Sequence, residues 1–115
     1  GEILVRSTSP HRAKSQSYTV KLHSEAELDL AEVFTWYEAQ ETGLGDEFLD
    51  EAAQLLRRLG RFPCTCPAVE PPFRRALFAR FPYAVYYLVE IRRVMIFAIL
   101  HQRREPDVWK RRFGN

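Results

Sequence analysis

The sequence offers little of what membrane or secreted proteins need. Among its 115 residues no apolar run approaches the about 20 residues that a membrane-spanning helix requires, and the longest run, residues 94–100, has the length of a strand. The N-terminal residues lack the long apolar core and the small-residue cleavage site of a secretion signal. We therefore expect a protein without a membrane segment, located in the cytoplasm.

Cysteine is scarce as well, with Cys64 and Cys66 placed two positions apart between prolines. A disulfide between them would be strained, and a zinc ion bound there would still lack two or more ligands. Both are expected to be free thiols, and the sequence predicts neither a metal site nor a cofactor.

What is present is the composition of one globular domain. Hydrophobic residues make up 46% of the chain and charged residues 28%, and 115 residues leave little room for a second core. The net charge is only +2, but acidic residues crowd into positions 25–51, whereas most arginines lie between positions 57 and 112. This separation predicts a basic face for an acidic partner, either nucleic acid or protein.

The first 17 residues hold four serines, one threonine and one proline, and they show no apolar periodicity after Val5. They are interpreted as an N-terminal extension outside the core. A single domain is expected over residues 18–113.

Two helices are expected in the first half of this domain. After an alternating strand at residues 18–23, Ser24 and Glu27 have the spacing of a capping box, which starts the first helix at Ser24. The G-L-G sequence at 43–45 predicts a tight reversal, and a second helix is expected over residues 46–60. Each helix has one apolar face, so the pair forms a helical hairpin. The apolar positions are Ala26, Leu30, Val33, Phe34 and Tyr37 in the first helix and Phe48, Leu49, Ala52, Leu55, Leu56 and Leu59 in the second.

Strands dominate the second half. Residues 62–72 contain four prolines and are expected to form an irregular connection. Three runs of β-forming residues follow at 74–81, 83–90 and 94–100, and closely spaced strands of this kind pair antiparallel. The last run is apolar on both faces, as expected of a central strand that helices cover on one side.

The predicted fold is therefore α+β, with the order β-α-α-β-β-β and a helical hairpin packed on a twisted antiparallel sheet. Proline is favourable in the first turn of a helix. Glu105, Pro106 and Asp107 are thus expected to begin a short C-terminal helix that carries Trp109.

Three motifs occur in order along the chain. They are D-L-x-x-x-x-x-W-Y-E with its G-L-G turn at residues 29–45, F-P-Y at 81–83, and H-x-R-R-x-P-x-x-W at 101–109. Together they resemble the ParE/RelE toxin superfamily, in particular its ParE-like plasmid-stabilisation branch, over residues 18–112. The resemblance implies the toxin of a type II toxin-antitoxin system.

The activity implied by this resemblance differs within the superfamily. ParE-like members are linked to inhibition of DNA gyrase, whereas RelE-like members cut messenger RNA on the ribosome. In both kinds a cognate antitoxin, here expected to be ParD-like, neutralises the toxin. Operator DNA is then a partner only through the antitoxin complex.

An RNA-cleaving site requires a base for the 2′-hydroxyl, cations for the charged phosphorane and a proton donor. The candidates are one histidine and several arginines: His101, Arg103, Arg104 and Arg75, with Arg74 and Arg80 as further cations. RelE-like nucleases resemble one another in basic positions that this sequence fills with Ala84, Leu77 and Ala79. The leading hypothesis is therefore a gyrase inhibitor without hydrolytic activity. The alternatives are a ribosome-dependent endoribonuclease and a degenerate, non-toxic member that only binds its antitoxin.

Two binding surfaces are predicted from residue type. Arg103, Arg104 and Trp109 are assigned to the target, because arginines bind acidic groups bidentately and an exposed indole anchors interfaces. Trp36 and three arginines of the second helix are assigned to the antitoxin: Arg57, Arg58 and Arg61. These assignments have structural alternatives: the tryptophans could be packing groups, and the arginines could form a solvated surface. For His101, among the nuclease candidates, the alternative is a structural hydrogen-bonding role.

Overall fold

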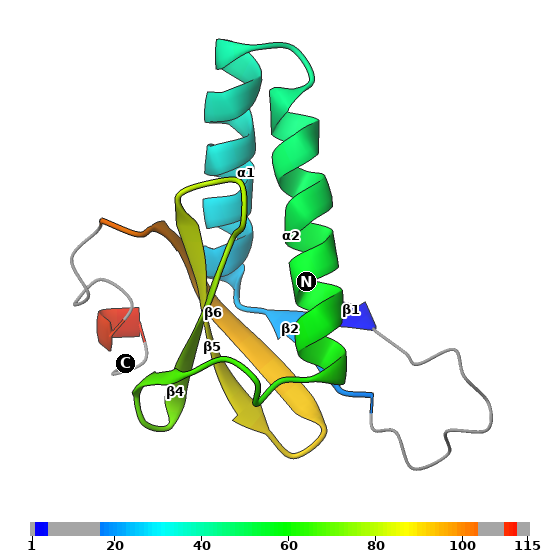
Figure 1. The fold of residues 1–115 in the computed structure, drawn as a ribbon, viewed down its shortest axis with the longest axis vertical. Coiled ribbons are helices and arrows are strands. Elements are labelled where there is room, and N and C mark those ends of the chain that lie inside the picture. Colours follow the sequence, from blue (N-terminus) through cyan, green and yellow to red (C-terminus); the bar gives the residue numbers. More distant parts are fainter. Residues whose placement is uncertain (1, 5–16, 104–109, 113–115) are drawn as a thin grey trace.

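The structure is a computed structural model that describes residues 2–4, 17–103 and 110–112. Within these residues, six strands and two long helices follow one another, and residues 110–112 form a further short helical segment (Figure 1). The strands are β1 (Glu2–Leu4), β2 (Thr19–Leu22), β3 (Ala68–Glu70), β4 (Phe73–Leu77), β5 (Tyr83–Glu90) and β6 (Arg93–His101). The helices are α1 (Ser24–Gln40) and α2 (Leu44–Arg61).

The described strands form one sheet in the order β1-β2-β6-β5-β4-β3. β2 pairs parallel with β6, whereas the other neighbouring pairs are antiparallel. The sheet is therefore mixed, which corrects the expectation of a purely antiparallel sheet. An alternating sequence pattern identifies a strand but carries no information about its direction. The chain passes through both helices and three strands between β2 and β6, and such a long crossover permits parallel pairing.

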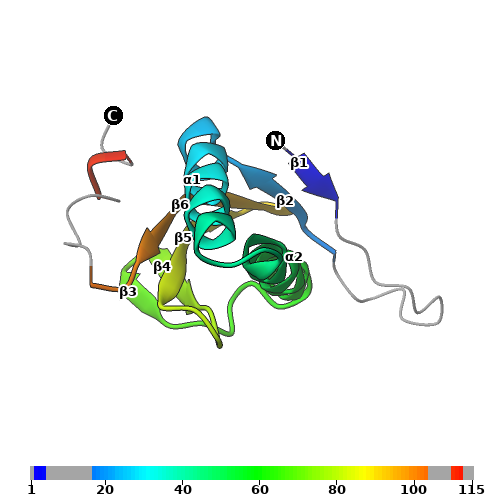
Figure 2. The ribbon, with the colours of Figure 1, turned by 90° about the horizontal axis from the view of Figure 1, so that it is seen from above.

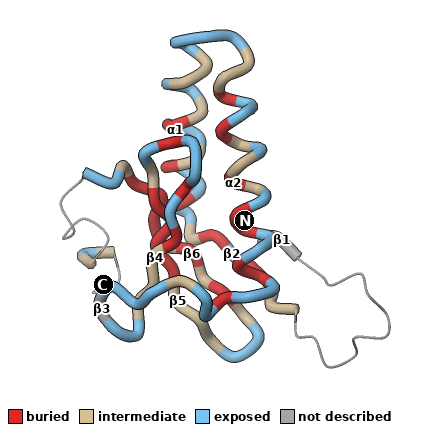
Figure 3. The backbone as a smooth tube through the Cα atoms, viewed as in Figure 1, coloured by how far each residue is buried: buried red, intermediate tan, exposed pale blue. Residues whose placement is uncertain are grey.

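The helical hairpin covers one face of this sheet, so the α+β class and the predicted layer arrangement are confirmed (Figure 2). α1 contacts β6, and α2 contacts both β2 and β6. Phe48 and Leu56 of α2 are fully buried against Val20 of β2 and Ile96 of β6 in one hydrophobic core. Buried positions gather where the hairpin crosses the sheet, while the tip of the hairpin is exposed (Figure 3).

The start of α1 differs from the capping box expected at Ser24 and Glu27. His23 is the N-cap, and its Nδ1 accepts a hydrogen bond from the backbone N–H of Glu25 at 3.2 Å. Ser24 is already helical, so its hydroxyl is one position too late to cap. The expected capping box is therefore wrong, although the helix does begin at Ser24.

The turn between the helices explains the end of the W-Y-E motif. The Glu38 carboxylate accepts hydrogen bonds of 2.9 Å from the N–H groups of Gly43 and Gly45, which satisfies two amides at the start of α2. Gly43 has φ 92°, a conformation that favours glycine. A Cβ atom at Gly45 would lie 2.7 Å from the ring of Phe34, so a larger residue would push the helices apart. α2 consequently starts at Leu44, two residues earlier than predicted.

Several predicted boundaries also change elsewhere in the sheet. The connection at 62–72 contains the short strand β3, and β4 ends at Leu77 instead of position 81. Residues 2–4 of the predicted extension form β1, which pairs with β2. Residues 5–16 lie outside the described part of the chain, so the boundary at residue 17 stays a prediction. The predicted helix start at 105–107 also lies outside it, whereas residues 110–112 are helical.

The proline-rich loop after α2 is held against the sheet by two side chains. The buried Tyr87 hydroxyl donates a hydrogen bond of 2.8 Å to the carbonyl oxygen of Pro63. The Arg74 guanidinium donates to the carbonyl oxygens of Cys66, at 2.6 Å, and Cys64, at 3.4 Å. Both cysteines are free thiols, as predicted.

Stability is expected to fall at alkaline pH because of Tyr87. Burial, together with the neighbouring Cys66 thiol, raises the pKa of Tyr87, so above about pH 10 the unfolded chain loses a proton that the folded chain retains. The free energy of unfolding should then decrease by up to about 1.4 kcal/mol per pH unit. Urea unfolding between pH 8 and pH 12 measures this slope. Tyr87→Phe should flatten it, and an identical slope in that variant would contradict the assignment.

Candidate partner-binding surfaces

A groove lies between α1 and the part of β6 that β2 does not reach. The last pair between β2 and β6 joins Leu22 to Ile96, so residues 97–101 have no strand neighbour on that side among the described residues. β6 also has an irregular register with β5 beside Phe97, which is typical of a β-bulge. The N–H group of Ile99 and the carbonyl of Phe97 are thereby directed to partners outside the sheet.

The open edge of β6 is closed by an ion pair between Asp29 of α1 and Arg112. Asp29 accepts hydrogen bonds from the Ile99 N–H at 2.9 Å and from Arg112 Nη1 at 2.7 Å. Arg112 also donates to the carbonyl oxygen of Phe97 at 3.2 Å and pairs with Glu25 at 2.7 Å. Asp29 is only 7% exposed, and the hydrogen bond from Arg112 raises the pKa of that guanidinium. The pair thus joins residues 110–112 to α1 and β6.

The rim of the groove is apolar and exposed. Leu28 and Trp36 of α1 are 62% and 56% exposed, and both side chains line the groove. Tyr83 of β5 and Ile99 of β6 line the groove opposite them, and its volume is about 540 Å³. Tyr37, predicted on the apolar face of the helix, packs against Phe81 at the core, while Trp36 lies at the margin of the core.

His101 lies at one end of this groove and belongs to the helix-covered face of the sheet. Its ring packs against Tyr83 with a centroid distance of 5.3 Å, and its Nδ1 accepts a hydrogen bond from the Arg103 N–H at 3.1 Å. Arg75 of β4 pairs with Tyr86, which belongs to a separate apolar cluster on the opposite face. The sheet therefore separates His101 from Arg75. Arg103 is exposed after β6, whereas Arg104 and Trp109 lie outside the described residues.

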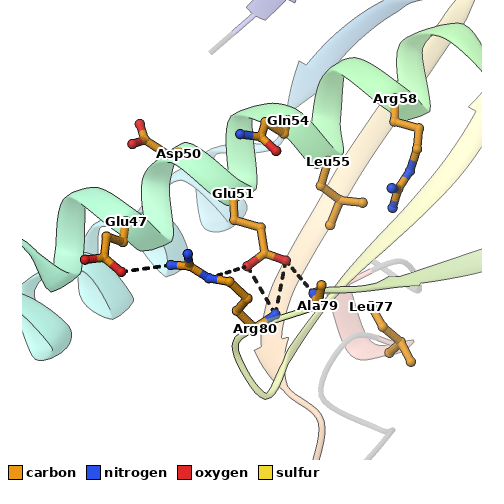
Figure 4. A pocket seen from close by; sticks show the side chains of 9 residues that line it. All are labelled: Glu47, Asp50, Glu51, Gln54, Leu55, Arg58, Leu77, Ala79 and Arg80. Carbon is orange, nitrogen blue, oxygen red and sulfur yellow. Dashed lines mark hydrogen bonds and ion pairs between the residues drawn. The ribbon is translucent and has the colours of Figure 1, made fainter.

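A second pocket lies between α2 and the loop that connects β4 to β5 (Figure 4). Glu51 of α2 accepts hydrogen bonds from the backbone N–H groups of Ala79 and Arg80. The Arg80 guanidinium pairs with Glu47 at 2.9 Å. These groups satisfy one another, so the cluster anchors the loop that carries the F-P-Y motif. Arg80, like Arg74, is therefore a structural cation and not a free one.

The residues assigned to the antitoxin do not form one surface. Trp36 lines the groove between α1 and β6, whereas Arg58 lines the pocket between α2 and the β4–β5 loop. Arg57 and Arg61 are exposed near the end of α2. In the described part of the chain, no group of three His, Cys, Asp or Glu side chains is placed to hold a metal ion.

Comparison with known protein families identifies the family of this chain. Residues 20–106 match the family described as the ParE toxin of the type II toxin-antitoxin system parDE. The chain belongs to the ParE toxin family. Among curated proteins, none matches the chain significantly.

Solved structures agree with this family at the level of the fold. One similar chain comes from the chromosomal ParDE toxin-antitoxin system of P. aeruginosa. The TM-score is 0.66 at 16% sequence identity, and the alignment covers 77% of this chain and 98% of the other. The two chains thus share the same fold although their sequences differ widely.

The buried ion pair between Asp29 and Arg112 of this ParE toxin was not among the features predicted from the sequence. Asp29 begins the D-L motif, but its partner Arg112 lies 83 positions away. The available signal was an acidic residue on the apolar stripe of a helix, which in a folded protein requires a partner.

Within the described residues, no helix is long and apolar enough to cross a membrane.

Proposed function

We propose that this ParE family member is a cytoplasmic toxin that inhibits DNA gyrase through a protein contact and has no hydrolytic site. The observation that carries the proposal is the placement of His101 and Arg75 on opposite faces of the sheet. General acid-base cleavage of RNA needs its base and its cations around one phosphate. A pair separated by a packed sheet cannot meet that requirement.

The internal pairing of two further candidate cations, Arg74 and Arg80, supports the same proposal. Arg74 donates to two loop carbonyls, and Arg80 pairs with Glu47. A catalytic arginine must be available to bind a developing phosphate charge, and both of these are engaged in holding loops. Arg103, exposed beyond β6, stays a proposed contact for the target together with Arg104 and Trp109.

We also propose that a cognate ParD-like antitoxin neutralises the toxin by occupying the groove between α1 and β6. Two large apolar side chains, Leu28 and Trp36, are more than half exposed on its rim. Exposed aromatic groups beside a groove are typical anchors of a bound peptide segment. An amphipathic segment of the antitoxin would cover both side chains and leave its polar face in water. Of the predicted antitoxin contacts, Trp36 is the one supported by this geometry.

A supercoiling assay with purified gyrase tests the proposed activity. The full-length chain should inhibit supercoiling, and the cognate antitoxin should relieve the inhibition. His101→Ala should inhibit gyrase as strongly as the unsubstituted chain, because the histidine has a packing role and no chemical one. Cleavage of messenger RNA on ribosomes without any effect on gyrase would overturn the proposal. A chain that inhibits neither process and causes no growth defect would instead be a degenerate member.

A further inference from the structure

Arginines gather where α2 ends and where β5 turns into β6. The backbone of residues 18–19 joins the two places, because the Tyr18 N–H donates to the Gly60 carbonyl at 2.9 Å and the Thr19 N–H donates to the Arg92 carbonyl at 3.0 Å. The lower end of α2 and the β5–β6 turn are accordingly close together in Figure 1. We call this region the arginine end, and it contains Arg57, Arg58, Arg61, Arg92 and Arg93.

The arginine end differs from the rest of the molecule in how its charges are satisfied. Arg80 and Arg112 form ion pairs with carboxylates that hold elements together. By contrast, Arg57, Arg58 and Arg92 are exposed and form no ion pair with any described residue. Of the five arginines, Arg93 is paired, with Glu90, and Arg61 lies over the ring of Phe62. The surface therefore retains an uncompensated positive charge.

The turn between β5 and β6 supports a role for this charge. Ile91 is 95% exposed, and Arg92 has φ 59°, a left-handed conformation that glycine or asparagine adopts at lower cost. A turn of this kind normally carries glycine, asparagine or aspartate at the left-handed position. The chain instead places a branched apolar residue and a guanidinium at the most exposed point of the hairpin. Strained backbone of this type is concentrated at functional positions.

The chemistry of the arginine end selects its partner. A protein interface of standard size buries about 800 Å² on each side around an apolar core. The large apolar side chains exposed among the described residues of this region are Ile91 and Phe62, which are too few for such a core. Affinity must then come from charge, as it does when arginines bind the phosphates of nucleic acid. We propose that the arginine end binds the phosphate backbone of a nucleic acid duplex.

This surface is separate from the groove proposed for the antitoxin. β6 begins at the arginine end with Arg93 and reaches the groove at Ile99 and His101. The six residue steps from Arg93 to Ile99, of roughly 3.3 Å each, place the two surfaces about 20 Å apart. The binding of phosphate does not depend on gyrase inhibition, so either proposal can fail without the other. Antitoxin in the groove would leave the arginine end open to a duplex.

Fluorescence anisotropy with a short labelled DNA duplex tests this proposal on the full-length chain. Binding should weaken steeply between about 50 and 200 mM salt, with a logarithmic slope of about −3 to −4 for four phosphate contacts. The double variant Arg57→Glu/Arg92→Glu should bind at least about tenfold more weakly and lose about two units of that slope. The matched control Arg75→Glu lies on the sheet face that the helices do not cover and should keep the slope, whereas Arg92→Glu, with the same change in charge, should lower it by about one unit.

Further arms separate the possible outcomes. Arg92→Gly removes one guanidinium and relieves the turn, so it should raise the melting temperature while weakening binding. An RNA duplex bound as well as DNA supports the phosphate contact, and the ratio of the two affinities identifies the preferred duplex. Equal losses in Arg92→Glu and Arg75→Glu would overturn the proposal, as would absence of salt-dependent binding. Polyglutamate bound as tightly as DNA would assign the surface to an acidic protein instead.

Discussion

Replacement of Asp29 by alanine is expected to lower the free energy of unfolding by about 3 kcal/mol, the lower end of the range for breaking a buried ion pair. The carboxylate accepts hydrogen bonds from Ile99 and Arg112, and its removal leaves both donors without their partner. The Arg112 side chain stays 17% exposed, so water compensates part of the loss. Urea unfolding monitored by circular dichroism measures the difference.

Glu25→Ala is the matched control for this prediction. Glu25 also pairs with Arg112, at 2.7 Å, but its side chain is 50% exposed. Removal of such a surface carboxylate should cost less than about 1 kcal/mol. If both substitutions lowered stability equally, burial of the Asp29 pair would not be the source of the effect. In a double-mutant cycle, Asp29→Ala and Arg112→Ala should be strongly non-additive, because each removes the other's partner.

Trp36→Ala is expected to weaken antitoxin binding by at least about 2 kcal/mol, which corresponds to roughly a 30-fold rise in Kd. The indole is 56% exposed on the rim of the groove, so its removal deletes an apolar anchor without opening the core. Titration calorimetry with the cognate antitoxin gives the two dissociation constants. The melting temperature of the free chain should change little.

Phe62→Ala provides the comparison, because Phe62 is an aromatic residue of similar exposure, 52%, at the end of α2. It lies outside the groove residues, so its loss should leave antitoxin affinity unchanged. If Phe62→Ala weakened binding while Trp36→Ala did not, the antitoxin would lie over the end of α2. That result would support the assignment of Arg57, Arg58 and Arg61 to the antitoxin.

The amino-acid sequence by itself determined both helices, the strands β2, β4, β5 and β6, their order and the layer arrangement. Apolar positions spaced by three and four residues identified both helices, and β-forming runs located most strands. The ordered motifs identified the family that residues 20–106 match. These features are encoded locally, since each depends on residues within one or two turns or strands. The sequence did not reveal that Glu38 caps α2, because Glu38 belongs to α1 and its carboxylate accepts hydrogen bonds from Gly43 and Gly45 on the other side of the turn.

Only the tertiary structure decided which distant residues meet. Asp29 and Arg112 are 83 positions apart, and no periodicity connects them. The parallel pairing of β2 with β6 depends on the path of the chain through the helical hairpin, and an alternation of apolar and polar residues does not specify that path. His101 and Arg75 were grouped in the sequence as one candidate site, but strand register places them on opposite faces. Local patterns of apolar residues specify the fold, whereas a functional site depends on which distant side chains come together, and only tertiary packing decides that.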